Sequence, residues 1–365
     1  MFQFIFSVSI ILIFFSKTTL GGDNCLVTDY DQIETALQTC KNIVIDSIIV
    51  PAKRELTLNI RDGTNLTFRG NISFEKEFWK GPLVRISGSN FYMRGEEGSV
   101  FDGNGPLYWD GLGTWGKTNK PKFMKINVHN ATMENINLRN CPVACVVIKG
   151  SDNLTIRNWV LDLLDGDEGV APPNKFGHNT DGFTIGSETN NLLIEDTTVY
   201  NQDDCVSITN GENITIRNIF CHGSHGLSIN GEGKIVKNVL ITDSVITNAQ
   251  NGIHVKTHLG SPPGLIQNVT YKDIKILDSK SYGVRIHQNY KNLSPGHSMD
   301  DPPENSVKIY DLNFINIFGN VQNGAIPVYI LCADEGCFDW TWEGVRLYGA
   351  RSNNCTGYTP EGFSC

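Results

Sequence analysis

The sequence predicts a single-domain, all-β protein folded as a right-handed parallel β-helix of about ten coils. Three observations predict this fold. A six-residue phrase recurs along the chain, each copy alternates apolar and polar residues, and one short amphipathic helix stands out after Gly22. Self-similarity of this kind indicates stacked supersecondary units, because each unit buries its apolar side against its neighbours.

The repeated phrase reads as a strand followed by a turn. A period of two is typical of a half-buried strand, and the Asn, Asp and Gly residues that bound each copy favour turns. Where no insertion intervenes, copies follow one another at about 22 to 25 residues. The clearest copies are 153–158, 191–196, 213–218, 238–243 and 268–273, and weaker ones begin at Asn65, Asn90, Asn130, Ser306 and Asp339.

The chain begins with an apolar run, Phe2–Phe15, followed by small and polar residues. This pattern is typical of a secretory signal peptide, and the run is too short to cross a bilayer. We therefore expect residues 1–22 to be a signal peptide and residues 23–365 to form one β-helix domain, secreted and extracellular.

Tyr30–Thr39 is the one segment with a helical pattern. Its apolar residues Ile33, Ala36 and Leu37 have helical spacing. Solenoids need a polar lid on their end repeats, so we expect this short helix to cap the first coil.

Three carboxylates fall at matching points of the repeat. Asp181 precedes the copy at Asn191 by ten residues, and Asp203 precedes the copy at Asn213 by ten. This spacing predicts that they occupy one column on successive coils, about 4.8 Å apart. A lone Asp in a β-helix turn is usually structural. With Asp204 the set becomes three like charges, which indicates a site for acid–base hydrolysis.

His225 and Lys256 extend this column. His225 follows Asn213 by twelve residues, and Lys256 precedes Asn268 by twelve. We therefore expect one face of the solenoid to carry the three carboxylates, an imidazole and an ammonium group.

Four runs in this region resemble the motifs of a known family. They are NTDGF at 179–183, NQDDC at 201–205, GSHGLSIN at 223–230 and NGIHVKT at 251–257, with Tyr282-Gly283 downstream. The chain is similar in these motifs to the polygalacturonases of glycoside hydrolase family 28. The resemblance implies a parallel β-helix that hydrolyses α-1,4-galacturonosyl linkages of pectin homogalacturonan, endo-acting, with inversion at the anomeric carbon and with no metal or other cofactor.

The resemblance also implies catalytic roles. Asp203 is expected to protonate the glycosidic oxygen, while Asp181 and Asp204 activate the attacking water, as an inverting hydrolase requires. His225 is expected to hold the acid in its working protonation state.

Substrate contacts are implied for Asn179, Lys256 and Tyr282. Lys256 would bind a galacturonate carboxylate as a point charge, and Tyr282 would pack on the sugar ring or bond to it.

One position departs from the family pattern, which reads Arg-Ile-Lys where this chain has His254-Val255-Lys256. An arginine holds a carboxylate through two parallel hydrogen bonds, whereas a histidine offers one and is charged only in acid or when well paired. Losing such a contact costs about 1.5–3 kcal/mol. We expect His254 to contact substrate, with weak activity, an acid-shifted optimum or inactivity as open alternatives. Arg285, on the next coil, could supply the missing charge if it faces the cleft.

The ten cysteines agree with secretion, because an even count in an extracellular chain indicates disulfides. The resemblance implies four pairs and leaves two cysteines over, which would form a fifth short loop. The expected bonds are Cys25–Cys40, Cys205–Cys221, Cys332–Cys337, Cys355–Cys365 and, from the remainder, Cys141–Cys145.

Eight Asn-x-Ser/Thr sequons occur, and we expect about two to four to carry glycan. Five of them also begin a repeat phrase, so turn chemistry is an alternative reason for their presence. The sequons begin at Asn65, Asn71, Asn130, Asn153, Asn213, Asn268, Asn292 and Asn354.

The expected partner is pectin, although the net charge is −9. Binding depends on the local field, and several cationic or titratable residues are expected around the site. No basic stripe or nucleic-acid motif is present, so nucleic acid is not expected as a partner. Nor is a membrane expected as a partner, once the signal peptide is removed, and we expect a monomer.

The loops 161–177 and 288–304 are expected to form the walls of the cleft. The residues expected around the site are Lys256, Arg285, His222, His254, His258 and His287.

Two other functions stay open on these residues. The histidine at position 254 favours a pectin-binding relative without activity. A different β-helix enzyme, such as a pectate lyase or a rhamnogalacturonan hydrolase, is the other alternative. A lyase needs calcium-binding carboxylates and an arginine base, so the missing motif arginine and the intact NQDDC run argue against it.

Overall fold

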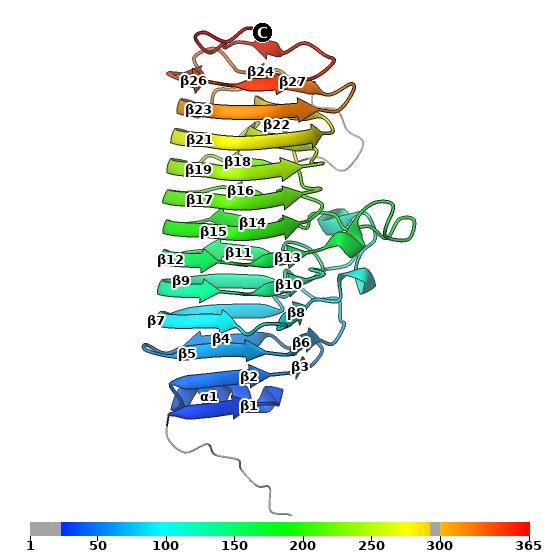
Figure 1. Ribbon diagram of the computed structural model, residues 1–365, viewed down its shortest axis with the longest axis vertical. Helices are drawn as coiled ribbons and strands as arrows, with labels where there is room; N and C mark the ends of the chain where they lie inside the picture. The colour runs from blue at the N-terminus through cyan, green and yellow to red at the C-terminus, as the bar shows by residue number, and fades with distance from the viewer. Residues whose placement is uncertain (1–22, 293–299) are drawn as a thin grey trace, which may run out of the picture.

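In the computed structural model the chain is one long right-handed parallel β-helix, as predicted (Figure 1). The structure describes residues 23–292 and 300–365, so the predicted signal peptide lies outside the described residues. The described strands stack coil on coil from the N-terminal to the C-terminal end. Three faces are formed in this way.

The first face carries the cleft described below. It consists of β4 (Leu56–Ile60), β7 (Val84–Gly95), β9 (Met124–Glu134), β11 (Val146–Lys149), β14 (Phe183–Gly186), β16 (Val206–Ile208), β18 (Leu227–Gly231), β20 (Asn251–His258), β22 (Tyr282–Tyr290), β24 (Ile326–Leu331) and β28 (Asn354–Thr356).

The other two faces complete each coil, and the longer strands bend across both. The second face contains β1 (Asn24–Val27), β2 (Asn42–Asp46), β5 (Asn65–Arg69), β12 (Asp152–Arg157), β15 (Asn190–Tyr200), β17 (Gly211–His222), β19 (Ile235–Thr247), β21 (Gly264–Ser279) and β23 (Val307–Val321). The third adds β3 (Ile49–Val50), β6 (Asn71–Phe74), β8 (Val100–Asp102), β10 (Asn137–Arg139) and β13 (Val160–Asp162), and the last coil ends with β25 (Cys337–Phe338), β26 (Trp342–Glu343) and β27 (Arg346–Tyr348).

Stacked aliphatic side chains form the core. On the first face, one inward position is aliphatic on coil after coil, and each of these side chains is fully buried. Because neighbouring coils are about 4.8 Å apart, each side chain packs on the same position of the next coil. This column contains Ile148, Ile185, Ile208, Ile229, Val255, Ile286 and Ile330.

The repeat phrases are strand segments that start at an asparagine ladder. Asn213, Asn238 and Asn268 have a left-handed backbone, and each donates its side-chain amide to the Asn of the preceding coil. Asn tolerates this conformation better than most residues. The turn chemistry suggested for the sequons at phrase starts is therefore present in the structure.

One predicted copy of the phrase was misplaced. The structure aligns Asp311, not Ser306, with Asn268, because Val269 pairs with Leu312. The left-handed Asn316 donates to Asp273, which lies 43 residues earlier. The run that begins at Ser306 also alternates, with Val307 and Ile309 buried, and it was therefore mistaken for the phrase.

The N-terminal cap is confirmed as a short helix. It starts with the 3-10 turn η1 (Tyr30–Gln32), capped by Asp29, and continues as α1 (Ile33–Thr39). Ile33, Ala36 and Leu37 are buried against the first coil.

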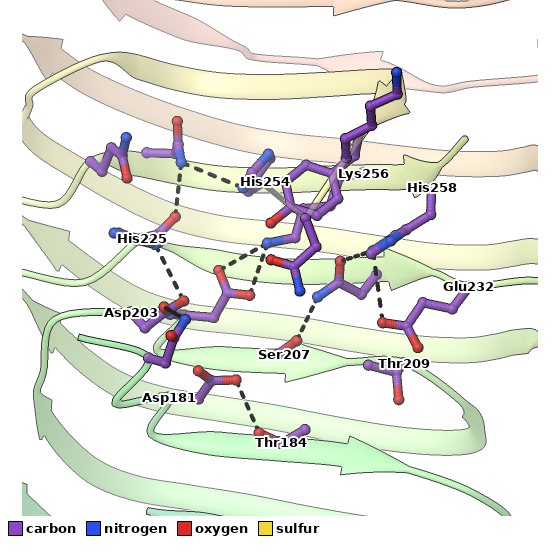
Figure 2. A pocket seen from close by; sticks show the side chains of 18 of the residues that line it. Asp181, Thr184, Asp203, Ser207, Thr209, His225, Glu232, His254, Lys256 and His258 are labelled. Atoms are coloured by element: carbon purple, nitrogen blue, oxygen red, sulfur yellow. Dashed lines mark hydrogen bonds and ion pairs between the residues drawn. The ribbon is translucent and has the colours of Figure 1, made fainter. Parts of the chain in front are cut away.

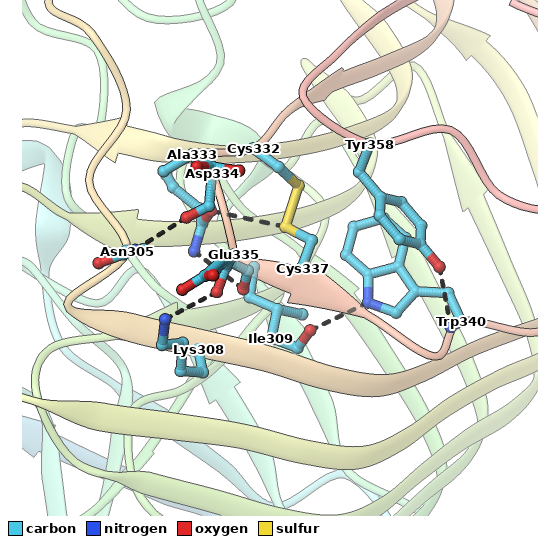
Figure 3. Close-up of a disulfide and its surroundings, with 12 residues drawn as sticks. Asn305, Lys308, Ile309, Cys332, Ala333, Asp334, Glu335, Cys337, Trp340 and Tyr358 are labelled. Carbon is cyan, nitrogen blue, oxygen red and sulfur yellow. Dashed lines mark hydrogen bonds between the residues drawn. A yellow bond between two sulfur atoms is a disulfide. The ribbon is translucent and has the colours of Figure 1, made fainter.

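A disulfide and an aromatic pair close the C-terminal end (Figure 3). Cys332 is bonded to Cys337. Nearby, the Trp340 indole donates to the Ile309 carbonyl, and its ring packs on Tyr358 at 4.5 Å. These groups cover the last coil, where no further repeat would bury its apolar edge.

All five expected disulfides are present, including Cys141–Cys145, and no free cysteine is found among the described residues. No helix in residues 23–292 and 300–365 is long and apolar enough to span a membrane.

Candidate active site

A polar cleft of about 570 Å³ lies over strands β14 to β22 (Figure 2). It brings together the three predicted carboxylates and the predicted cations. Among the residues that line it are Trp115, Asn179, Asp181, Thr184, Asp203, Asp204, His225, His254, Lys256, Arg285 and Tyr290.

The backbone register differs by one residue from the predicted column. Phe183 pairs with Val206, and the Gly182 amide donates to the Asp204 carbonyl, so Asp181 is level with Asp204 rather than Asp203. The turn after β14 is one residue longer than the turn after β16, which shifted the count from the repeat phrase.

Lys256 also lies off the predicted column. The register places it level with Asn230, farther along its strand. Its long side chain nevertheless returns toward the carboxylates, as described below.

The turn that carries Asp203 and Asp204 is held from inside by Asn201. The amide of this buried Asn donates to the carbonyl groups of Thr180, Asp203 and Asp204. The Cys205–Cys221 disulfide directly follows this turn and ties it to the strand that leads toward His225. The carboxylates thus project from a rigid backbone, as a catalytic constellation requires.

Asp203 is bound by His225 and Asn179. Its Oδ1 lies 3.2 Å from His225 Nδ1, and its Oδ2 accepts from Asn179 Nδ2 at 3.1 Å. The Asp203 side chain is 13% exposed and that of His225 is 30% exposed. This pair therefore faces the cleft, and Asn179, which also lines the cleft, binds the other oxygen of the carboxylate.

Asp204 is bound by Lys256 and Ser228. Lys256 Nζ lies 3.0 Å from Asp204 Oδ2, and Ser228 Oγ donates to Oδ1 at 2.6 Å. Both charged side chains are nearly fully buried. Burial lowers the pKa of Lys256, but the adjacent Asp204 outweighs it, so the net shift is upward and Lys256 is a permanent cation. Its ammonium is therefore paired with a carboxylate of the chain itself.

Asp181 is the carboxyl without a cationic partner. Thr184 Oγ1 donates to its Oδ2 at 3.1 Å. Burial, reinforced by the charges of Asp203 and Asp204, holds the pKa of Asp181 well above its usual range. Asp203 and Asp204 each have a cation as partner and Asp181 has none, so the protonated form of Asp181 is favoured.

Asp203 and His225 share one proton across their hydrogen bond. Burial raises the pKa of Asp203, but His225 and Lys256 lower it by more, so the net pKa of Asp203 is below its usual value. Burial lowers the pKa of His225, but Asp203 and Asp204 raise it more, so the net pKa lies above 6.5. Within this pair the proton therefore favours the imidazole.

Asp203, Asp204 and His225 each offer one atom that could bind a metal ion, and these three atoms lie within 4.8 Å of one another. Lys256 already pairs with one of these carboxylates and His225 with the other. The cationic charge that these groups need is thus supplied by the chain itself.

His254 lines the cleft but is almost fully buried in a histidine pair. Its Nε2 is 3.0 Å from His287 Nε2, and His287 Nδ1 is 2.8 Å from Asn289 Oδ1. Burial, with the charge of Lys256, places the pKa of His254 well below 6.5. The expectation that His254 becomes a charged contact in acid therefore does not fit its buried position.

Arg285 does face the cleft. It is level with His254 on the next coil and lines the cleft. Within the described ranges its guanidinium has no acidic partner, and its buried Nε has no hydrogen-bond acceptor. Its guanidinium carbon lies 4.5 Å from the centre of the Tyr282 ring. Tyr282 itself is not among the cleft-lining residues, so its position supports Arg285 more directly than it supports a sugar.

Two aromatic residues of the cleft were not predicted. Tyr290 packs on Lys256 and on His258, and Trp115 comes from the loop between β8 and β9. Of the two predicted wall segments, 288–304 lines this cleft with Tyr290, Lys291 and Asn292, whereas no residue of 161–177 lines it. Trp115 lies in a loop outside the repeat, where periodicity gives no signal. Tyr290 is the last residue of β22, and none of the recognised motifs includes it. His222, which was expected at the site, bonds to Thr247 and does not line this cleft.

Comparisons with known proteins agree with this geometry. The family model described as glycosyl hydrolases family 28 matches residues 40–365. The chain is 39% identical to “Probable endopolygalacturonase I” of Aspergillus terreus and 38% identical to “Endopolygalacturonase I” of Aspergillus niger, in each case over 96% of this chain and 93% of the relative. The solved structure of endopolygalacturonase I from Stereum purpureum, in complex with two galacturonates, superposes with a TM-score of 0.82 at 32% identity, covering 91% of this chain and 96% of that one.

Proposed function

The chain belongs to family 28 of the glycosyl hydrolases, and on this premise we propose that its cleft cuts pectin homogalacturonan within the polymer by inverting hydrolysis. The protein is a glycoside hydrolase, a pectin-hydrolysing polygalacturonase. One observation carries the proposed mechanism: in one cleft Asp203 is paired with His225 and Asp204 with Lys256, whereas Asp181 has no cationic partner.

Asp203 acts as the general acid, with its proton stored on His225. When a glycosidic oxygen approaches Asp203, the proton passes from His225 Nδ1 through the carboxyl group to that oxygen. The bond between the anomeric carbon and the oxygen then breaks, and the leaving sugar departs as an alcohol. The distance of 3.2 Å between Nδ1 and Oδ1 supports this transfer.

Asp181 acts as the base toward water. A raised pKa makes its carboxylate a stronger base once it is ionised. Water attacks the anomeric carbon from the opposite face of the sugar, and its proton goes to Asp181. Asp204, oriented by Lys256 and Ser228, holds the water from its other side.

Arg285 supplies the principal contact with a galacturonate carboxylate. It is the cleft cation without an acidic partner among the described residues, whereas Lys256 is already paired with Asp204. A guanidinium stacked on Tyr282 is pre-oriented, so it loses little freedom on binding a carboxylate. Asn179 reaches the substrate through Asp203, which it orients.

We also propose that the mature domain comprises residues 23–365, is secreted, and works as a monomer. Five disulfides support an oxidising compartment.

Incubation of the purified protein with demethylated polygalacturonate tests the reaction. We expect new reducing ends, no ultraviolet absorbance from unsaturated uronate, a fall in viscosity that precedes most of the reducing-end release, and initial β-anomeric product by proton NMR. Unsaturated product would identify a lyase. Binding to the polymer without any product would identify a pectin-binding relative.

A further inference from the structure

We propose that Trp115 is a stacking platform for a galacturonate ring on the N-terminal side of the catalytic coil. The inference rests on the proposed function and adds a residue that determines substrate affinity. Trp115 lines the cleft together with Asn179 and Asp203, although it lies far from both in the sequence.

A hydrogen-bond chain connects the Trp115 loop to the catalytic acid. The amide and hydroxyl groups of Thr114 both donate to Asn179 Oδ1, at 3.0 and 2.8 Å. The other end of the Asn179 amide donates to Asp203. These hydrogen bonds therefore fix the backbone that carries the Trp115 indole relative to the carboxylate of Asp203.

A buried lysine holds the same loop from below. Lys120 Nζ donates to both Asp110 oxygens at 2.8 Å and to the Gly113 carbonyl at 2.7 Å, with its side chain 1% exposed. Gly113 has a φ of +56°, and a Cβ there would lie 2.5 Å from Asn179 Oδ1. The loop is thus built to approach Asn179 closely, and its shape does not depend on the indole.

The indole itself is left uncovered. Trp115 is 43% exposed, whereas the other five tryptophans are buried or partly buried. Among the described residues, the Trp115 ring makes no aromatic or cation–π contact. The exposed part of this ring adjoins the catalytic carboxylates, so it offers an apolar face to a ligand bound there.

A sugar ring fits this surface. The C–H groups on one face of a pyranose are apolar, while its hydroxyl and carboxylate groups point outward. A rigid aromatic face can cover those C–H groups at little cost in side-chain entropy. The polar edge of the same sugar would then face the Asn179 and Asp203 side of the cleft.

The test combines kinetics with fluorescence. We expect Trp115→Ala to raise KM for polygalacturonate about tenfold with little change in kcat, and Trp115→Phe to restore most of the affinity. Leu112→Ala is the matched control, because Leu112 is 48% exposed in the same loop but does not line the cleft. It should leave KM unchanged.

Titration of the Asp203→Asn protein with tetragalacturonate provides a readout that does not need turnover. We expect tryptophan fluorescence to change on binding, and this change to disappear in Asp203→Asn/Trp115→Phe. An active parent whose KM is the same in Trp115→Ala, or equally raised in Leu112→Ala, would overturn the platform alone. A fluorescence change without any hydrolysis by the parent would support the platform and overturn the proposed reaction. Absence of both would overturn both.

Discussion

His254 and His287 stack as a buried pair with ring centres 5.2 Å apart and planes 6° from parallel. His287 Nδ1 donates to Asn289 Oδ1, so its Nε2 carries a lone pair and accepts from His254 Nε2. His254 Nδ1 in turn lies within reach of the Asn251 amide, at 3.4 Å. The pair is neutral and its hydrogen bonds are satisfied, so His254 is part of the buried support of the cleft.

Restoring the family's arginine should therefore harm the fold. We predict that His254→Arg lowers the free energy of unfolding by about 2–3 kcal/mol, because it adds a cation beside Lys256 and Arg285 and leaves His287 Nε2 without a donor. Denaturant unfolding measures this loss. An unchanged midpoint together with a lower KM would show that the arginine fits and binds substrate.

The histidine pair should also make stability depend on pH. Burial lowers the pKa of His287 to about 3, and that of His254 well below 6.5. Both are neutral in the folded state but take up protons when unfolded, so their contribution is present above pH 6.5 and is lost as pH falls toward 3. The slope is at most about 1.4 kcal/mol per pH unit for each histidine. Unfolding at several pH values should show a flatter dependence in His254→Gln/His287→Gln, and an equal slope would contradict the assignment.

Asp181 should reduce the stability of the folded protein. Its folded pKa is raised, so its stabilising contribution is present below the unfolded value of 3.8 and is lost as pH rises through the folded pKa. We predict that Asp181→Asn gains about 0.5–2 kcal/mol at pH 7 while kcat falls by about 10²- to 10⁴-fold. A variant that is less stable than the parent would mean that Asp181 is ionised and paired in the folded protein.

Asp204 should behave in the opposite way. Asp204→Asn removes the partner of the buried Lys256, which lies 3.0 Å away, and should cost about 3–5 kcal/mol of stability. Calorimetric or denaturant unfolding would detect this at once. A loss below about 1 kcal/mol would show that Lys256 finds another partner.

Arg285 should control substrate affinity. We predict that Arg285→Ala raises KM about 10- to 100-fold, the effect of one charged hydrogen bond. Lys291→Ala is the control, because Lys291 also lines the cleft but is already paired with Asp301 at 2.6 Å. Equal effects of the two substitutions would argue for a general electrostatic field instead of a specific contact.

The coils were predictable because each strand repeats the same alternation. The aliphatic column from Ile148 to Ile330 and the asparagine ladder follow from residue types within one coil and its neighbours. The predicted register failed where it was counted across turns, because the turns differ in length between coils. One additional residue after β14 moved Asp181 level with Asp204, and the alternation of Val307 and Ile309 placed the predicted copy at Ser306 instead of Asp311.

The site was predictable where motifs carry it and unpredictable where separate coils meet. Asp203 and His225 come from specific runs and are adjacent as expected. The hydrogen bond of His254 is made to His287, which lies 33 residues later and carries no pairing signal in the sequence. Trp115 reaches the cleft from a loop outside the repeat, so periodicity could not place it.

The pH dependence of kcat/KM for reducing-end release, in the parent and in Asp203→Asn, tests the central claim most directly, because this ratio reports the free enzyme. The account predicts a bell-shaped profile. Its acidic limb lies above pH 3.8, where Asp181 ionises, its alkaline limb lies above pH 6.5, where His225 loses its proton, and the variant is at least about 100-fold slower throughout. Parental activity in Asp203→Asn, or an alkaline limb below pH 6.5, would contradict the proposed transfer from His225 through Asp203.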